Sequence, residues 1–142
     1  MKSENLIENK SFDFAVRIVN LYKHMLKVHR EGNLSKQILR SGTSIGANVC
    51  EATRAQSRKD FIAKMNIALK ESYETEYWLR LLHKADYITD AEFKSIFTEN
   101  QDISNIIAKV STPRWLSAVN STVTSLISNK QAEEMFDTLI KQ

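Results

Sequence analysis

The alternation of hydrophobic and polar positions predicts several long amphipathic helices. Across residues 12–28 the apolar residues follow helical spacing on one broad arc, and polar residues fill the rest of the helix surface. This arc is wider than the roughly 100° that packing on one neighbouring helix requires. The first helix is therefore expected to be buried on two sides, as in a bundle that also forms oligomers.

Capping signals mark where later helices begin. Residues 31–33 interrupt the first pattern, with Gly32 as the expected helix terminator and Asn33 as the expected N-cap of the next helix. The Ser-x-x-acid arrangement at residues 57–60, and Thr-x-x-Glu at residues 89–92, have the form of capping boxes. The later helices are expected over about residues 34–53, 58–84 and 90–110. Short links between four such helices are typical of an all-α, antiparallel up-down four-helix bundle.

The last part of the chain has a weaker pattern. Thr112 and Pro113 form a cap followed by proline at the first helical position, and apolar residues recur beyond them at helical spacing. We interpret this part as an additional C-terminal helical arm. The expected division is a bundle domain over residues 1–112 and an extension over residues 113–142.

Composition narrows the class of protein. A chain of 142 residues suits one domain, and with only 3 Gly and 1 Pro it favours long helices over a many-turned β-fold. Cys50 is the only cysteine, which excludes an internal disulfide and suits a reducing compartment. No signal-peptide core and no run near ~18 apolar residues is present, so we expect a cytoplasmic protein without a membrane span.

Charge is distributed unevenly along the chain. Residues 1–64 hold 12 Lys and Arg against 6 Asp and Glu, whereas residues 65–142 hold 8 against 11. A basic half is compatible with RNA or DNA as partner. From charge alone, an ordinary solvated surface whose two halves pair within an oligomer is the more frequent explanation. The candidate nucleic-acid-binding residues are Arg17, Lys23, Lys27, Lys36, Arg40, Arg54, Arg58 and Lys59.

The two glycines within residues 37–52 raise the possibility of a phosphate-binding loop. Such a loop follows a strand and closes on Lys-Ser/Thr, and neither feature is present here. Gly42, Gly46 and Cys50 instead recur every four residues, so they stack on one helix face. We interpret them as small residues that let another helix approach closely.

Polar residues on the second and third helices have two interpretations. Asn48 and Glu51 lie one turn apart among small and apolar neighbours, and either Arg40 or Arg54 could pair with Glu51. We favour a structural polar network that includes Asn48, Glu51 and Glu74 and fixes the register of the two helices. Direct contact with a ligand is the second interpretation.

The sequence offers no recognisable catalytic or metal-binding motif. His24, His29 and His83 have no metal-ligand spacing, and His24 and His29, five residues apart, are expected to point to different sides of an α-helix. No Glu-x-x-His pair accompanies Glu71, Glu74 and Glu76. We therefore expect no enzyme activity, no cofactor, no metal and no small-molecule substrate.

Aromatic residues suggest an oligomer interface. Tyr22, Tyr77 and Trp78 are the candidates, because the adjacent Tyr77 and Trp78 must face different directions and only one can point into the core. Stacking on nucleic-acid bases is the alternative role for such side chains.

The glycine-containing helix carries a family resemblance. Residues 37–52, QILRSGTSIGANVCEA, resemble a signature that runs approximately QLRRSATSIPANIAEG in four-helix-bundle proteins encoded by intervening sequences of bacterial 23S rRNA genes. Gly46 stands where the family usually has proline, and Ala52 where it usually has glycine. The resemblance covers about residues 12–110; the third helix agrees at Phe61, Ile62, Ala68, Leu69, Glu74, Glu76 and Leu79.

This resemblance implies a left-handed up-down bundle that assembles into a homopentamer. The family is also similar in fold to the accessory variability determinant of diversity-generating retroelements, a basic pentamer that binds reverse transcriptase and nucleic acid, and its members have no known enzymatic activity. The leading hypothesis is a non-enzymatic homo-oligomer that binds nucleic acid or a ribonucleoprotein through a basic surface. The alternative is a protein-interaction scaffold that binds no nucleic acid.

Overall fold

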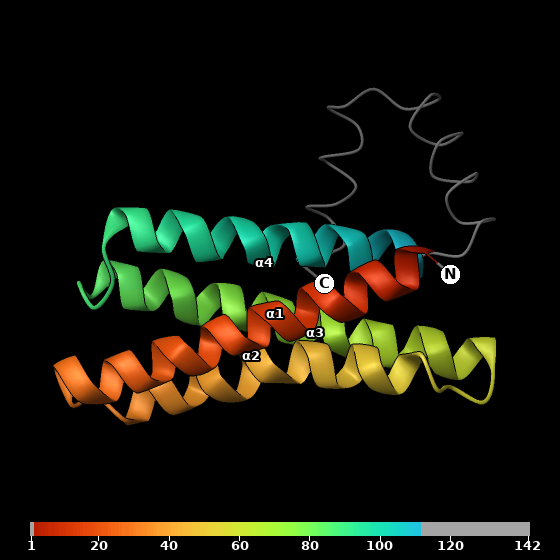
Figure 1. Ribbon diagram of the computed structural model, residues 1–142, viewed down its shortest axis with the longest axis horizontal. Coiled ribbons are helices and arrows are strands. Elements are labelled where there is room, and N and C mark those ends of the chain that lie inside the picture. Colours follow the sequence, from red (N-terminus) through yellow and green to blue (C-terminus); the bar gives the residue numbers. More distant parts are fainter. Residues whose placement is uncertain (1, 112–142) are drawn as a thin grey trace, which may run out of the picture. The chain divides into compact units, whose positions relative to one another are not determined.

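The computed structural model describes residues 2–111, with side chains from Leu6 onward, and this part of the chain is all-α. It contains four α-helices, one π-helical turn and no strand (Figure 1). The elements are α1 (Lys2–His24), η1 (Met25–His29), α2 (Asn33–Ala52), α3 (Arg58–Lys84) and α4 (Asp90–Ser111). The predicted C-terminal arm and the division after residue 112 lie outside the described residues.

The helix bounds agree closely with the sequence pattern except at the first helix. α3 has the predicted bounds, and α2 begins and ends within one residue of them. α1 begins at Lys2, well before Phe12, where the apolar pattern becomes continuous. Its first turns are polar apart from Leu6 and Ile7, but the fully buried Ile7 anchors them to the core.

The caps explain where α3 and α4 begin. The Ser57 hydroxyl accepts a hydrogen bond from the Asp60 backbone N–H at 3.1 Å, as predicted. Thr89 and Glu92 form the reciprocal pair of a capping box, in which each backbone N–H donates to the other residue's side chain at 3.2 Å. These bonds satisfy backbone donors that a helix start leaves without partners.

The predicted N-cap of α2 is wrong. The Glu31 carboxylate, and not Asn33, caps this helix by accepting three backbone N–H bonds, each of 3.0 Å. A glutamate two residues before the helix is long enough to reach back over the first turn. Burial raises the pKa of Glu31, but these three backbone donors outweigh it and hold the pKa below its ordinary value of 4.5.

The first helical segment ends differently from the prediction at Gly32. η1 continues α1 as a π-helix, and Arg30 then takes a left-handed conformation with φ of 51°. The Arg30 backbone N–H donates to the Met25 carbonyl oxygen and closes the segment. Gly32 has a φ of −108° and does not use the freedom of glycine.

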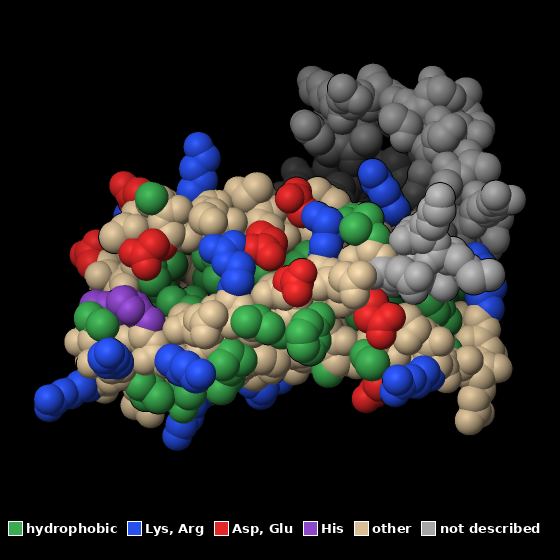
Figure 2. All heavy atoms as spheres, viewed as in Figure 1, with side chains coloured by type: hydrophobic (Ala, Val, Ile, Leu, Met, Phe, Trp, Pro, Cys, Tyr) green, Lys and Arg blue, Asp and Glu red, His purple; other side chains and the backbone are tan. Residues whose placement is uncertain are grey.

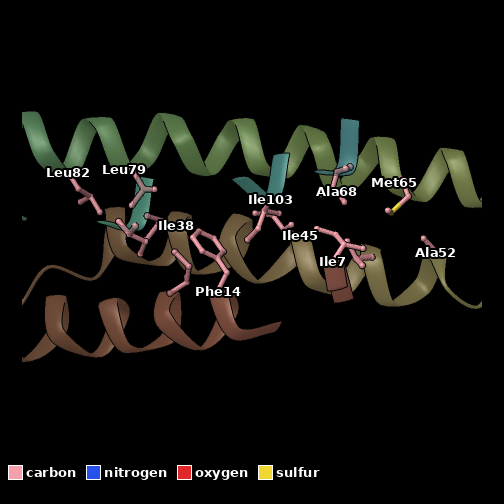
Figure 3. Packing of buried hydrophobic residues seen from close by; sticks show 14 of the residues in the cluster. Ile7, Phe14, Ile38, Ile45, Ala52, Met65, Ala68, Leu79, Leu82 and Ile103 are labelled. Atoms are coloured by element: carbon pink, nitrogen blue, oxygen red, sulfur yellow. The ribbon is translucent and has the colours of Figure 1, made fainter. Parts of the chain in front are cut away.

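The core lies between the four helices. α1 packs on α2, α2 on α3 and α3 on α4, while α1 and α4 make fewer contacts with each other. Figure 3 shows Phe14 of α1, Ile38 and Ile45 of α2 and Leu79 of α3 converging on this core. All four of these side chains are fully buried.

The broad apolar arc of the first helix divides into a buried and an exposed half. Phe14, Ile18 and Met25 are fully buried, although Phe14 lies outside the arc that the sequence pattern suggested. Phe12 is 67% exposed and Val28 is 57% exposed. The described residues alone therefore do not cover the outer half of the arc.

The sparse contact between α1 and α4 leaves a pocket of about 470 Å³. Ile88 and Ile96 contribute apolar side chains to its lining, and Arg17, His24 and Glu92 contribute polar ones.

Candidate nucleic-acid interface

The eight predicted nucleic-acid-binding residues do not form one surface. Lys23, Lys27 and Lys36 lie around the α1–α2 connection, whereas Arg54, Arg58 and Lys59 lie at the turn between α2 and α3. α2 has 20 residues and is therefore about 30 Å long, which separates the two groups. We refer to Lys23, Lys27 and Lys36 as the α1–α2 cations, and to Arg54, Arg58 and Lys59 as the α2–α3 cations.

The other two candidates are engaged within the bundle. Arg17 forms an ion pair with Glu99 of α4 and also donates to the Ser95 hydroxyl at 3.0 Å. Arg40 pairs with Glu74 and Glu71, both on α3. These arginines join neighbouring helices, so their charge is partly neutralised before any ligand arrives.

The six remaining cations are exposed, and none pairs with an acidic group among residues 6–111. Sequence reasoning also left out other exposed cations of this kind, among them Arg30 and Lys84. Arg30 has a left-handed backbone and Lys84 lies at the end of α3. Their positions next to the expected helix ends were visible in the sequence.

The residues proposed as one polar network make separate contacts. Asn48 donates to the Ser44 carbonyl oxygen of its own helix at 2.8 Å. Glu51 pairs with Lys64 at 2.9 Å and not with an arginine, and Glu74 pairs with Arg40. The hydrogen bond and the charge of Glu51 together raise the pKa of Lys64 above its ordinary value. Asn48, Glu51 and Glu74 are therefore not joined to one another.

Polar contacts between α2 and α3 nevertheless exist at other residues. The buried Thr75 hydroxyl donates to the Ser41 hydroxyl at 3.0 Å. Beside them Glu71 lies close to Arg40, at 3.7 Å. Burial raises the pKa of Glu71, although the nearby Arg40 guanidinium opposes this shift. This cluster and the ion pairs at Glu51 and Glu74 join α2 to α3.

The small-residue face of α2 contacts α1. A Cβ atom added at Gly42 would lie 2.7 Å from a side-chain carbon of Ile18, and one at Gly46 would lie 3.1 Å from the Ser11 carbonyl oxygen. Both distances are shorter than ordinary van der Waals contact. Cys50, the third member of this stripe, is a partly buried free thiol.

The three predicted interface aromatics differ in exposure. Tyr77 is 59% exposed, Tyr22 is half-buried, and Trp78 is partly buried against the core. The Tyr77 and Trp78 rings meet edge to face with centroids 5.0 Å apart. The other large exposed apolar residues are Leu6, Phe12, Val16, Leu26 and Val28 on α1 and η1, and Ile67 and Tyr73 on α3.

The described residues contain neither a cluster of potential metal ligands nor a helix suited to span a membrane. Within this part of the chain, no group of three or more His, Cys, Asp or Glu residues is placed to hold a metal ion. Among the helices that the structure describes, none has the length and apolar character needed to span a membrane. The arrangement that remains is a set of unpaired surface cations on a helical scaffold.

Over the described residues 2–111, the fold and surface thus define an all-α protein of four long helices with cationic helix connections. The family model of the 23S rRNA-intervening sequence protein matches residues 3–109, and the chain belongs to this family. The recognition made from residues 37–52 is confirmed, over a match that begins earlier than residue 12.

A solved structure supports the same assignment. The chain is 53% identical to a protein of unknown function from the S23 ribosomal protein family of Bacteroides thetaiotaomicron VPI-5482, with a TM-score of 0.75. The match covers 78% of this chain and 99% of that one. Comparison with the curated proteins gives no match.

Proposed function

We propose that this protein is a non-enzymatic, cytoplasmic homo-oligomer that binds RNA or DNA, free or within a ribonucleoprotein, through cations at the ends of an antiparallel up-down bundle. The oligomer is a pentamer in this proposal, as the family resemblance implies. A reverse transcriptase is the kind of ribonucleoprotein component that the same resemblance suggests as partner.

The observation that carries the proposal is the set of six exposed cations without acidic partners in the described region. Binding to nucleic acid gains free energy mainly when Lys and Arg neutralise phosphates and release counterions. A cation that is already paired with a carboxylate causes less counterion release when it contacts a phosphate. The six cations without such a partner are therefore better candidates than Arg17 and Arg40. A ring of identical subunits would also multiply each group of cations.

The α2–α3 turn is the stronger candidate at neutral pH. Residues 50–64 hold four Lys and Arg against two Asp and Glu, and three of these cations are the exposed Arg54, Arg58 and Lys59. Helical side chains of this kind contact phosphates without reading base edges, so little sequence preference is expected.

Titration of binding with salt tests this proposal. A labelled single-stranded RNA should bind at low salt, and its affinity should fall linearly with salt on logarithmic axes. Replacing Arg54, Arg58 and Lys59 together by Gln should lower affinity by at least about tenfold and flatten the slope by up to about 2, because each lost phosphate contact removes ~0.7.

A matched control removes three other charges. The variant Lys70→Gln, Lys94→Gln, Lys109→Gln also loses three exposed cations, none of which is ion-paired within residues 6–111. It should keep most of the affinity, because these residues lie outside the two groups. Equal losses in both variants would mean that only net charge matters, and an absence of binding at low salt would refute the proposal.

The second candidate function is a scaffold that binds another protein and no nucleic acid. The exposed apolar residues of α1 and α3 favour it, because soluble proteins rarely leave such patches uncovered. Capture of the same protein partner from a nuclease-treated lysate, together with failure to bind RNA, would support the scaffold.

A further inference from the structure

All three histidines of the chain line one pocket of about 490 Å³, formed by the end of α1, η1 and the turn from α3 to α4. The His24 and His29 rings lie 6.0 Å apart between centroids, and His29 meets Tyr87 edge to face at 5.2 Å. His83 lies 2.6 Å from an Asp90 carboxylate oxygen. Figure 2 shows the histidines, in purple, at the left end of the bundle.

The π-helical turn accounts for this convergence. In an α-helix two residues five positions apart lie about 140° apart around the axis, which is why the sequence predicts His24 and His29 on different sides. A π-helix makes i→i+5 hydrogen bonds and so brings such residues onto one face. The expectation from the sequence is therefore wrong because η1 replaces an α-helical turn.

Charged groups surround the three rings from every neighbouring element. Glu92 of α4 lies near His24 and His29, and Asp90 of α4 pairs with His83. Asp86, in the α3–α4 turn, also lines the pocket. The remaining charged or titratable neighbours are Arg17 beside His24, Arg80 and Lys84 beside His83, and Tyr87 in the turn.

The two chain segments that form most of this pocket are close to electrical balance while the imidazoles are neutral, with Arg17 and Arg80 of the adjoining helices outside the count. Residues 23–36 and 83–92 together hold five Lys and Arg and four Asp and Glu, a net charge of +1. Protonation of the three histidines raises that charge to +4. Imidazole is the side chain whose charge changes near physiological pH in general.

We propose that the histidine pocket is a proton-controlled switch for phosphate binding, which makes the α1–α2 cations available to nucleic acid as the pH falls. The inference rests on the nucleic-acid binding proposed above and assigns its regulation to a second site, about one helix length from the α2–α3 turn.

The switch acts through the carboxylates of the pocket. While the imidazoles are neutral, Asp86, Asp90 and Glu92 repel phosphate at this end of the bundle and offset the charge that Lys23, Lys27 and Lys36 contribute to it. Protonated histidines neutralise these carboxylates, so Lys23, Lys27 and Lys36 are left with uncompensated charge. In support, hydrogen bonds from Thr89 first, and the charge of His24 and His29 in addition, lower the pKa of Glu92.

The test measures binding of a labelled oligouridine, whose bases do not titrate in this range, at about pH 7.5 and about pH 5.5 at constant salt. Affinity should rise about tenfold on acidification. This is the increase expected in water when three additional positive charges, one on each imidazole, attract phosphates about 8 Å away. The variant His24→Gln, His29→Gln, His83→Gln should show no such rise. Circular dichroism at both pH values checks that each variant stays folded.

Two further variants make the outcome specific. Asp86→Asn with Asp90→Asn should raise affinity at pH 7.5 and shrink the gain on acidification, and Asn tolerates the left-handed backbone of Asp86. Replacing Lys23, Lys27 and Lys36 together by Gln should remove most of the gain on acidification and leave the affinity at pH 7.5 almost unchanged, because at that pH the α2–α3 cations bind.

The failure of this inference is distinguishable from failure of the proposed function. Wild-type binding that does not change with pH, or a full gain in the triple histidine variant, overturns the switch and leaves the α2–α3 site standing. Loss of binding at pH 7.5 in the α2–α3 variant, with the gain on acidification retained, supports both sites. No binding at either pH refutes both.

Discussion

At the scale of single residues, the close contact between α1 and α2 depends on two glycines of α2, which carry no Cβ atom. Gly42 faces the fully buried side chain of Ile18, and Gly46 faces the backbone of Ser11. A glycine in mid-helix costs ~1 kcal/mol of helix propensity relative to alanine. The close approach of the two helices is the structural reason for accepting that cost.

Gly42→Ala is therefore expected to destabilise the protein by roughly 1–3 kcal/mol, because the added methyl would overlap three carbons of Ile18 within 3.0 Å. Gly46→Ala should also destabilise, since its neighbour is helix backbone that cannot rotate away. Chemical denaturation of each variant measures the free energy of unfolding.

Gly32→Ala provides the matched control. Its Cβ would meet only Leu26, at an ordinary distance of 3.5 Å, and its φ of −108° suits any residue. This variant should keep wild-type stability. Equal stability of Gly42→Ala and Gly32→Ala would show that α1 and α2 do not pack as described.

At the scale of whole elements, the caps and periodicity of the sequence predicted three helices well. The Ser57 and Thr89 caps were readable because their partners lie three residues further along the chain. Glu31 was missed as the cap of α2 because its carboxylate accepts bonds from backbone N–H groups two to four residues further along the chain, outside the usual pattern.

Other features of the elements depend on tertiary structure and could not be predicted. Nothing in the sequence of residues 25–29 distinguishes a π-helical turn from an α-helical one. Which half of the apolar arc of α1 faces the core depended on the neighbouring helices, and the buried Phe14 was not among the residues of that arc. The candidate cations were predictable as exposed charges, but the carboxylates that engage Arg17 and Arg40 were not.

The cap of α2 leads to a pH-dependent prediction. The pKa of Glu31 is lowered in the folded state, so its contribution to stability is present above its ordinary value of 4.5 and is lost as the pH falls below it. Glu31→Ala should cost about 1 kcal/mol near neutral pH. The difference from wild type should shrink as the pH falls below 4.5.

Asp102→Ala is the control for this prediction. Asp102 is an exposed carboxylate of α4 with no hydrogen bond or ion pair to the described side chains or backbone outside its helix. Its removal should leave stability almost unchanged. A Glu31→Ala difference that persisted undiminished in acid would mean that the charged carboxylate is not what caps α2.

At the scale of the whole molecule, α1 and α3 carry exposed apolar residues on separate helices. Each of the two packs on α2, and each also contacts α4, so they lie diagonally across the bundle. Figure 2 shows hydrophobic side chains gathered in the middle of one face of the bundle. A closed ring of odd number joins two different faces of each subunit, which these two helices could provide.

Light scattering should therefore give a multiple of the 16.3 kDa chain mass at micromolar concentration, five-fold if the resemblance to the family extends to assembly. The double variant Phe12→Ser, Val16→Ser should disrupt the exposed apolar face of α1. The double variant Tyr73→Ser, Tyr77→Ser should disrupt that of α3. Each double variant alone should be monomeric.

Mixing the two double variants tests whether α1 of one subunit contacts α3 of another. Each retains the face that the other lacks, so an equimolar mixture should form a dimer of one subunit of each kind and grow no further. A wild-type monomer would refute the oligomer. Mixed variants that stay monomeric would show that α1 and α3 do not meet across subunits.

The small number of contacts between α1 and α4 also affects local unfolding of the bundle. Because few contacts join these two helices, α1 can separate from α4 while α2 and α3 remain packed, so its opening should require less free energy than unfolding of the whole bundle. Backbone amides near His24 and near the start of α4 should exchange their protons with solvent through this local opening. Amides of α2 and α3 around Ile45 and Leu79 should exchange only when the entire bundle unfolds.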